Sequence, residues 1–297
     1  MVERYVREEF KELDRLVGLA SVKGEISRLA QRLVNEKHYR ALGVSVLPTR
    51  RHLVFSGPAG VAKSKVARIF GQICYRLGTL DKGHMVIVDH ADLTAASFDE
   101  KVARMRAKCD AALDGILYIR NEAFLAAGIL RSTGDLRLDA VDVMIEAMAR
   151  HRGRIIVVLD ARPNQLQCIS FHSGLARRFT ETIDFPAHDA LELMRILAAK
   201  AEHLGLDLPD GLESDLIPWI AAHSRRHDWR NAYEIADLFS RALGARAARG
   251  ARERCADLGG FRRSDFKHAL NARQANGTID AVASMNFDSG ASQPSLP

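Results

Sequence analysis

The stretch Leu53-Val-Phe-Ser-Gly-Pro-Ala-Gly-Val-Ala-Lys-Ser-Lys-Val-Ala-Arg68 decides the fold. It predicts a short apolar strand, a glycine-bearing loop and a helix that begins near Lys63. This is the layout of a phosphate-binding P-loop, in which backbone N–H groups and a helix N-terminus face the phosphates. In this motif the lysine meets the charge of the β- and γ-phosphates, and a Ser or Thr hydroxyl reaches Mg²⁺. We therefore expect a nucleotide site with Lys63 and Ser64 in these roles.

The P-loop motif is one residue short of complete. Gly57, Gly60, Lys63 and Ser64 fit G-x-x-x-x-G-K-[ST], but Ala62 stands where the second fixed glycine belongs. A Cβ at this position crowds a turn whose backbone must approach the phosphates closely. The predicted nucleotide-binding residues of the loop are Gly57, Pro58, Ala59, Gly60, Val61, Ala62, Lys63, Ser64 and Lys65, with Ser64 also the predicted metal ligand.

Length and composition indicate a soluble globular protein. The 297 residues suggest about two domains, and 47% of them are apolar while 27% are charged. No apolar run approaches the roughly 18 residues that a membrane span needs. The charged start, Met1 to Phe10, lacks the apolar core of a signal peptide, so we expect a cytoplasmic protein.

The net charge of +6 is modest for this length, and its densest basic part is Arg241 to Arg254. A nucleic-acid surface would interleave such a stripe with aromatic side chains for base stacking, and none is present here. The stretch is therefore interpreted as a solvated helix face, and nucleic acid is not expected as a partner.

The order of the predicted elements gives the fold class. Strands are expected from Leu53 to the P-loop and at 85–89, 115–119, 155–159 and 182–186. Helices are expected at 3–15, 20–42, 98–114 and 139–151, and one more begins near Lys63. Strands that alternate with helices indicate an α/β fold whose parallel sheet is covered on both faces. From Asp189 the pattern is helical only, with helices at 189–204, 212–223, 229–250 and 263–273.

This change of pattern predicts the domain organisation. We expect a nucleotide-binding core with N-terminal helices at 1–187 and an all-α domain at 188–276. The segment 277–297 is rich in Ser, Gly, Ala and Pro, which is typical of a disordered tail.

Five motifs together resemble one clade of AAA+ ATPases. They are Leu16-Val-Gly-Leu-Ala-Ser-Val-Lys23, the P-loop, Lys82-Gly-His84, Gly115-Ile-Leu-Tyr-Ile119 and Gly174-Leu-Ala-Arg-Arg-Phe179. Their order and spacing are similar to those of the red-type Rubisco activase CbbX (CfxQ), the EccA ATPase of type VII secretion and stage V sporulation protein K. The resemblance covers roughly residues 12–250.

The resemblance implies a P-loop αβα sandwich with a small helical lid. It also implies ATP or ADP with Mg²⁺ at a subunit interface, and a hexameric ring that pulls polypeptide through a central pore. Val17 and Gly18 match the segment that lies against adenine in this clade. Arg178 stands where the family's Ser-Arg-Phe places its arginine finger, which reaches the neighbouring subunit's site, and Arg177 replaces the serine.

The second acidic motif departs from the family pattern. Where the family has Gly-Val-Leu-Phe-Ile-Asp-Glu-Ala, this chain has Gly115-Ile-Leu-Tyr-Ile-Arg-Asn-Glu-Ala123. Without a gap, Arg120 replaces the Mg²⁺-orienting Asp and Asn121 replaces the Glu that activates water. With one inserted residue, Asn121 replaces the Asp and Glu122 remains as the base, and the following Ala123-Phe124 favours this register. In both registers the metal-facing carboxylate is missing, which weakens the expected Mg²⁺ dependence.

Two further positions differ from the family. Counted back from Leu238-Phe239, the lid arginine that touches the γ-phosphate falls on Ala236. The pore loop falls on Ser97-Phe98-Asp99, where an aromatic remains but is shifted by one residue and the glycine is replaced.

Three functions are compatible with this pattern, and the sequence does not identify the client protein. The favoured one is a nucleotide-binding AAA+ protein with little or no hydrolysis. It would act as a regulatory or scaffold subunit, in a ring with itself or with an active relative. The second is a working ATPase that remodels a protein client such as Rubisco or a secretion substrate. The third is a relic of the fold that binds a partner through its basic lid face and binds no nucleotide.

Overall fold

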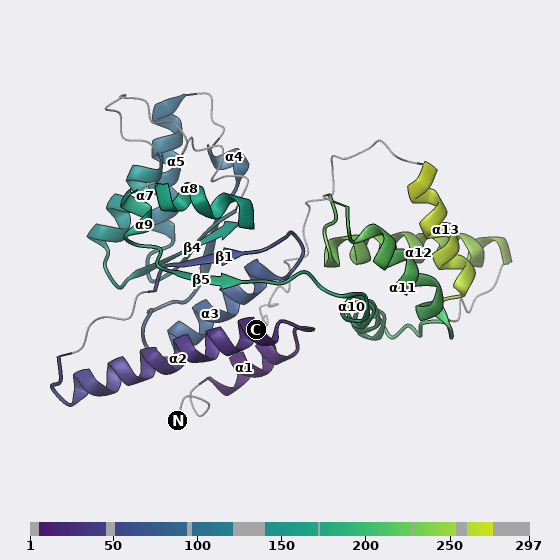
Figure 1. The fold of residues 1–297 in the computed structure, drawn as a ribbon, viewed down its shortest axis with the longest axis horizontal. Coiled ribbons are helices and arrows are strands. Elements are labelled where there is room, and N and C mark those ends of the chain that lie inside the picture. Colours follow the sequence, from purple (N-terminus) through teal and green to yellow (C-terminus); the bar gives the residue numbers. More distant parts are fainter. Residues whose placement is uncertain are drawn as a thin grey trace, which may run out of the picture.

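A five-stranded parallel sheet forms the centre of the larger part of the molecule, and the helices α10 to α13 lie beside that part (Figure 1). The computed structural model describes residues 6–45, 51–93, 97–120, 140–171, 173–226, 228–253 and 260–275. The strands are β1 (Leu53–Ser56), β2 (Met85–Val88), β3 (Gly115–Ile119), β4 (Ile155–Ala161) and β5 (Glu181–Asp184), in the order β2-β3-β4-β1-β5. Every pairing is parallel, so the carboxyl ends of all five strands lie along one edge of the sheet.

The central strands are mostly apolar, as is typical of strands with helices on both faces of the sheet, and Ser56 of β1 and Asp160 of β4 lie at their carboxyl ends. All residues of β1 and β3 are buried. On one face they pack with α1 (Arg7–Asp14), α2 (Ala20–Ala41) and α3 (Lys63–Arg76), through side chains such as Ile26, Phe70 and Tyr118.

The opposite face is covered by a second set of helices. These are α4 (His90–Leu93), α5 (Phe98–Ala111), α7 (Ala140–Arg150), α8 (Leu166–Phe171) and α9 (Ser173–Ala176), and a 3₁₀ turn, η2 (Pro163–Gln165), precedes α8. Leu117 and Ile119 of β3 point into this layer, opposite to Ile116 and Tyr118. The alternation fixes which residues of β3 face the P-loop helix α3.

Four helices after β5 form a separate all-α unit with its own core. They are α10 (Ala190–His203), α11 (Leu212–His223), α12 (Ala232–Glu253) and α13 (Arg263–Ala275). Leu197, Leu216, Leu238 and Phe266 are buried together at its centre. A capping box starts α10, in which the Asp189 carboxylate accepts from the Glu192 N–H and the Glu192 carboxylate accepts from the Asp189 N–H.

The predicted fold class, an α/β sandwich with a parallel sheet and a small helical lid, is confirmed. The bounds differ most at 3–15, where α1 occupies 7–14, and at 229–250, where α12 begins at Ala232 and ends at Glu253; β5 occupies 181–184 instead of 182–186. The short helices between 163 and 176 were not predicted from the sequence. The domain limits remain a prediction, and the tail at 277–297 lies outside the described residues.

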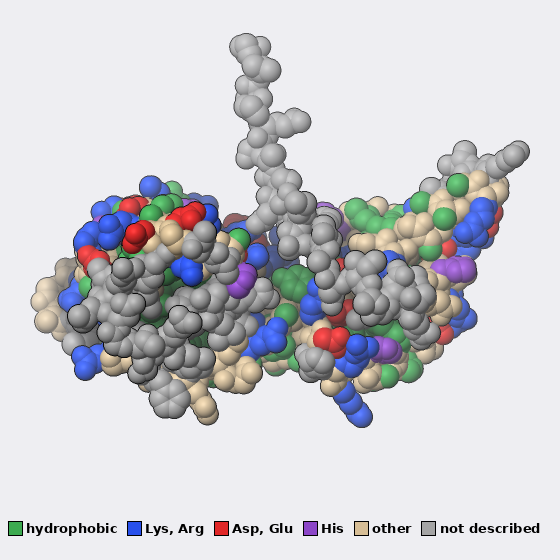
Figure 2. All heavy atoms as spheres, turned by 90° about the horizontal axis from the view of Figure 1, so that it is seen from above, with side chains coloured by type: hydrophobic (Ala, Val, Ile, Leu, Met, Phe, Trp, Pro, Cys, Tyr) green, Lys and Arg blue, Asp and Glu red, His purple; other side chains and the backbone are tan. Residues whose placement is uncertain are grey.

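Charges of both signs are mixed on one face of the molecule. On the face shown in Figure 2, Lys and Arg side chains are interspersed with Asp and Glu on both parts of the molecule. Among the described helices, none combines the length and the apolar character that crossing a bilayer requires.

Candidate nucleotide-binding site

The P-loop lies at the carboxyl end of β1, which runs between β4 and β5 near the centre of the sheet. Gly57 has φ 153° and Gly60 has φ 75°, both in the region that favours glycine. A Cβ on Gly57 would overlap the carbonyl of Phe185, and one on Gly60 would overlap the carbonyl of Arg230. Both glycines are therefore required by backbone that approaches the loop from β5 and from the lid.

Ala62 immediately precedes α3 in a left-handed conformation, with φ 62° and ψ 22°. This conformation costs a residue with a Cβ about 1–2 kcal/mol relative to its usual helical state. The chain thus keeps the backbone path of a P-loop although the glycine that suits this path is absent. Ser64, in the first turn of α3, is half-buried, and Lys65 is exposed.

Lys63 is held inside the loop, and only 7% of its side chain is exposed. Its Nζ donates to the carbonyl oxygens of Gly57 at 2.6 Å and Pro58 at 2.7 Å, and it lies 3.0 Å from Oδ1 of Asp160. Burial lowers the pKa of Lys63, and the Asp160 carboxylate opposes that shift. The Asp160 carboxylate thus favours the charged form of Lys63, at the point where a P-loop meets phosphate.

Asp160 was not among the residues predicted from the sequence. It belongs to the carboxyl end of β4, opposite Phe55 of β1, and its Oδ2 accepts a hydrogen bond of 2.7 Å from the Tyr118 hydroxyl. Burial, and then the neighbouring Asp160, raise the pKa of Tyr118 well above its usual value, so the phenol stays protonated and donates. Tyr118 of β3, Asp160 of β4 and Lys63 of the P-loop thus form a chain of polar contacts across two neighbouring strands.

The predicted adenine segment, Val17 and Gly18, lies beside the start of the lid. Gly18 has φ 66°, and a Cβ there would overlap the carboxylate of Glu192 on α10. The Lys23 ammonium fixes the preceding turn by donating to the carbonyls of Asp14 at 3.0 Å and Leu16 at 2.7 Å. Val17 is half-buried beside this turn.

Asn231, which was not predicted from the sequence either, joins the lid to the P-loop. Its Nδ2 donates to the carbonyl of Ala59 at 2.9 Å, and its Oδ1 accepts from the backbone N–H of His188 at 3.2 Å. The residue is 1% exposed and has φ 48°, a conformation that asparagine tolerates better than most residues. The Ala232 N–H, at the start of α12, also donates to the carbonyl of Gly60 at 3.3 Å.

The strand β3 ends beside this arrangement. Arg120 follows it, is exposed, and donates its N–H to the carbonyl of Val88 at 3.0 Å, which continues the ladder to β2. Because Ile116 and Tyr118 face α3, continued alternation places position 120 on the same face. Asn121 and Glu122 lie outside the described residues, so the predicted roles of these two residues remain predictions.

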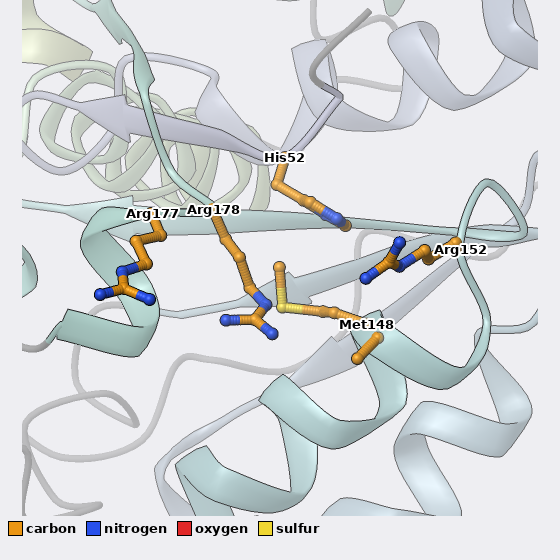
Figure 3. Close-up of a pocket in the computed structure, with 6 residues that line it drawn as sticks. His52, Met148, Arg152, Arg177 and Arg178 are labelled. Atoms are coloured by element: carbon orange, nitrogen blue, oxygen red, sulfur yellow. The ribbon is translucent and has the colours of Figure 1, made fainter. Parts of the chain in front are cut away.

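The predicted finger, Arg178, lies at the opposite end of the strands, just before β5. It points into a pocket of about 390 Å³ that is lined by His52, Met148, Arg152 and Arg177, whereas Arg177 points away from His52 (Figure 3). Nη1 of Arg178 donates to the carbonyl of Gly174 at 2.9 Å. Burial, followed by the charges of Arg178 and Arg51, lowers the pKa of His52 to about 4, so this imidazole adds no positive charge to the pocket near neutral pH.

Comparisons with known proteins agree with this geometry. The chain is 33% identical over 199 residues to the ESX-3 secretion system protein EccA3 of Mycobacterium leprae, which covers 66% of the chain and 31% of that protein. It is 30% identical over 193 residues to the stage V sporulation protein K of Bacillus subtilis (64% of the chain, 59% of that protein). It is 26% identical over 244 residues to the CfxQ homologue of Guillardia theta, with 81% and 82% covered. No protein-family model matches the chain.

The chain belongs to the CbbX/EccA clade of AAA+ ATPases. It spans about a third of the length of the EccA3 relatives that it matches. As in other members of the AAA+ family, the nucleotide site is therefore expected where the P-loop, the segment at Val17 and the lid meet.

Two AAA+ positions in which this chain departs from the clade are described by the structure. Ala236, at the predicted position of the lid arginine, is half-buried one turn into α12, and its methyl group carries no charge. Ser97 of the predicted pore loop caps α5, because its hydroxyl accepts from the Glu100 N–H at 3.2 Å. Phe98 and Asp99 consequently belong to the first turn of that helix.

The described residues fit a nucleotide. The backbone at Gly57 and Gly60, the N-terminus of α3 and the ammonium of Lys63 are the elements that receive phosphate groups in a P-loop. The lid contacts this loop through the hydrogen bond from Asn231 to Ala59. Mg²⁺ when bound would neutralise phosphate charge, and Ser64 is the residue of this loop that would hold it. Within the described ranges, no group of three or more His, Cys, Asp or Glu side chains forms a metal site by itself.

Proposed function

We propose that this AAA+ protein binds ATP or ADP at its P-loop with a weakened dependence on Mg²⁺. We propose further that it hydrolyses ATP slowly or not at all and acts as a regulatory or scaffold subunit. The observation that carries the proposal is the contrast along one sheet edge: the phosphate lysine is held at the end of β1, and Arg120 follows the end of β3.

The charges of the site support a loss of hydrolysis, and they do not support a loss of phosphate binding. Phosphate binding needs backbone N–H groups, a helix N-terminus and a cation, and the P-loop retains all three. Hydrolysis needs in addition a carboxylate that orients the metal-bound phosphate and a base that orients water. Arg120, which follows β3, repels a divalent cation. Ala236, at the predicted position of the lid arginine, offers no positive charge to the γ-phosphate.

Alternation along β3 favours the ungapped alignment, with Arg120 at the metal-facing position. Residues 116 and 118 face α3, so residue 120 shares their face unless a bulge intervenes. The inserted alignment, in which Asn121 takes this position and Glu122 serves as the base, requires such a bulge after Ile119.

Ring assembly and a protein client complete the proposal. Relatives in this clade are named for a secretion system, for Rubisco activation and for sporulation, so the client class is a protein complex, without a preference among them. The ring, hexameric as AAA+ rings usually are, would contain this chain alone or together with an active relative. In either case Arg178 would serve the neighbouring subunit's site.

A nucleotide titration at several Mg²⁺ concentrations, run beside an ATPase assay, tests the proposal. We expect ATP and ADP to raise the melting temperature of the purified chain with and without Mg²⁺, because a ligand that binds only the folded state stabilises it. We expect phosphate release well below the 1 s⁻¹ or more that is typical of enzymes. Ordinary turnover would instead support a working ATPase that remodels a protein client. A melting temperature that no nucleotide changes would support a relic that binds its partner through the basic lid face.

A further inference from the structure

Three oxygen atoms of the protein itself surround the Lys63 ammonium. An ammonium group has three donors, and the Gly57 carbonyl, the Pro58 carbonyl and the Asp160 carboxylate lie at 2.6, 2.7 and 3.0 Å from Nζ. Two of these partners are neutral carbonyls of the loop, and only the third carries a charge. Asp160 is therefore the counter-ion of the lysine that the phosphates of a nucleotide would have to approach.

Asp160 is held in place from the side opposite to the lysine. Its Oδ2 accepts from the Tyr118 hydroxyl at 2.7 Å, and Tyr118 is 1% exposed in the layer beneath α3. Its Oδ1 is buried and, apart from the ammonium of Lys63, has no hydrogen-bond partner among the described residues. The side chain is 17% exposed, so water screens the ion pair only in part.

We propose that Asp160 is a built-in counter-ion that competes with nucleotide phosphate for Lys63 and thereby lowers the affinity of the P-loop for nucleotide. The inference rests on the proposed function, since it concerns the same phosphate site. Asp160 is a positioning residue here: it acts on the lysine, and it is not assigned a contact with the nucleotide.

Like-charge repulsion is the physical reason. A phosphate that reaches Lys63 comes next to the Asp160 carboxylate, or it draws the lysine away and leaves that carboxylate buried without its cation. Both outcomes are unfavourable in a partly desolvated site, where charges interact more strongly than in water. Removing the negative charge while keeping the shape of the side chain should therefore strengthen the binding of anions at the loop.

The test is the substitution Asp160→Asn in the full chain, with ATP binding measured by calorimetry in EDTA and in Mg²⁺. Asparagine keeps an oxygen that accepts from Tyr118 but carries no charge. We expect ATP to bind about tenfold more tightly in both conditions, a change that corresponds to about 1.4 kcal/mol. We also expect a lower melting temperature without nucleotide, because a buried lysine loses its counter-ion, and a larger rise on adding ATP.

Asp184→Asn is the matched control. Asp184 is the last residue of β5 at the same sheet edge, but it is exposed and pairs in register with Ser56. Its substitution removes the same charge without touching Lys63, so ATP affinity should change less than about twofold. If Asp160→Asn folds poorly, Asp160→Ser provides a second neutral variant, with the same expected direction.

Unchanged or weaker ATP binding by Asp160→Asn in EDTA would overturn the inference. Binding that weakens only in Mg²⁺ would also overturn it, and would show that Asp160 faces the metal. The variant Lys63→Ala separates this failure from a failure of the proposed function. If the native chain binds ATP and Lys63→Ala does not, the P-loop is the site, whatever Asp160→Asn does. A third outcome is that Asp160→Asn binds ATP while the native chain and the double variant Asp160→Asn, Lys63→Ala do not. This outcome would mean that the counter-ion prevents ATP binding altogether in the native chain.

Discussion

The P-loop side and the β3 side of one sheet edge have diverged to different extents from the AAA+ pattern. On the P-loop side, Gly57, Gly60 and Lys63 keep the backbone path and the buried cation of a phosphate site. On the β3 side, an exposed arginine follows the strand at Ile119. The two regions are neighbours in space, because only β4 separates β3 from β1.

Under the proposed function, the difference means that nucleotide binding and nucleotide hydrolysis depend on separate parts of the same site. Binding depends mainly on main-chain geometry, which a single substitution such as Ala62 strains without destroying. Hydrolysis depends on individual side chains, each of which can be lost in one step. A chain can therefore lose turnover while its fold and its phosphate loop persist.

The largest expected effect concerns a site on a neighbouring subunit. Mixing this chain with a finger-deleted, otherwise intact relative should restore phosphate release by on the order of a thousandfold, because Arg178 would offset charge on the transferred phosphoryl group. The measurement is phosphate release by the mixture, compared with the same mixture containing Arg178→Ala.

Arg177→Ala is the matched control for this experiment, since Arg177 is the adjacent arginine and is exposed. Rescue that survives Arg178→Ala but fails with Arg177→Ala would move the finger role to Arg177. Equal rates with all three forms would show that neither arginine is donated.

Next in size is the loss of nucleotide binding on substituting Lys63. We expect Lys63→Ala to weaken ATP binding about a hundredfold, because charged hydrogen bonds contribute about 1.5–3 kcal/mol each. The thermal shift, measured at a nucleotide concentration that saturates the native chain, should largely vanish. Lys267→Ala, at an exposed lysine of α13 outside the loop, should keep it. A shift that persists in Lys63→Ala would place the nucleotide elsewhere.

Repairing the β3 side should raise turnover about tenfold to a hundredfold, and the pair that succeeds identifies the alignment. Arg120→Asp with Asn121→Glu repairs the ungapped alignment, which the alternation of β3 favours. Asn121→Asp with Ala62→Gly repairs the inserted alignment and keeps Glu122 as the base. Steady-state phosphate release distinguishes them, and no gain from either pair would mean that the defect lies outside β3, for example at Ala236.

A smaller effect, on stability, is expected at Asn231. Replacing it with Ala leaves the Ala59 carbonyl and the His188 N–H without their partner, and should lower the free energy of unfolding by about 2 kcal/mol. Asn231→Gly removes the same amide but tolerates φ 48°, so it separates the lost hydrogen bonds from backbone strain. Urea denaturation measures both, with the exposed Asn164→Ala as a control that should change little. Equal free energies of unfolding for the native chain and all of these variants would show that the Asn231 hydrogen bonds between lid and loop do not stabilise the fold.

The smallest effect is expected at Ala62. Ala62→Gly relieves a left-handed conformation but adds flexibility to the unfolded chain, so we expect a net gain of no more than about 1 kcal/mol. Ala107→Gly makes the same change at an exposed position inside α5 and should instead lose about 1 kcal/mol. Thermal denaturation of the two variants compares them, and equal losses would show that φ 62° carries no strain.

Much of the fold could be predicted from the sequence, because buried parallel strands are continuous apolar runs. The strand at 115–119 was predicted with the bounds that β3 has, and the helix at 212–223 matches α11. The helices α8 and α9 were missed because segments of six and four residues are too short to show a helical period.

Residues of the nucleotide site could be predicted only where they belong to a known sequence motif. Asp160 carries a signal, since an acidic residue that ends an apolar strand lies at the edge where α/β folds bind ligands. Its contact with Lys63 nevertheless depends on β4 lying beside β1, which no local pattern specifies. Asn231 is 172 residues from Ala59, and only the packing of the lid brings them together.

The amide of Asn231 gives the molecule a mechanical property. One side chain holds the P-loop at Ala59 and the entrance to α10 at His188, while the next residue bonds Gly60. A displacement of the loop would therefore weaken its contacts with the lid. A displacement of the lid would in turn strain the loop. Strain applied to the helical unit would thus reach the phosphate site through two short links, the Asn231 amide and the hydrogen bond from Ala232 to Gly60.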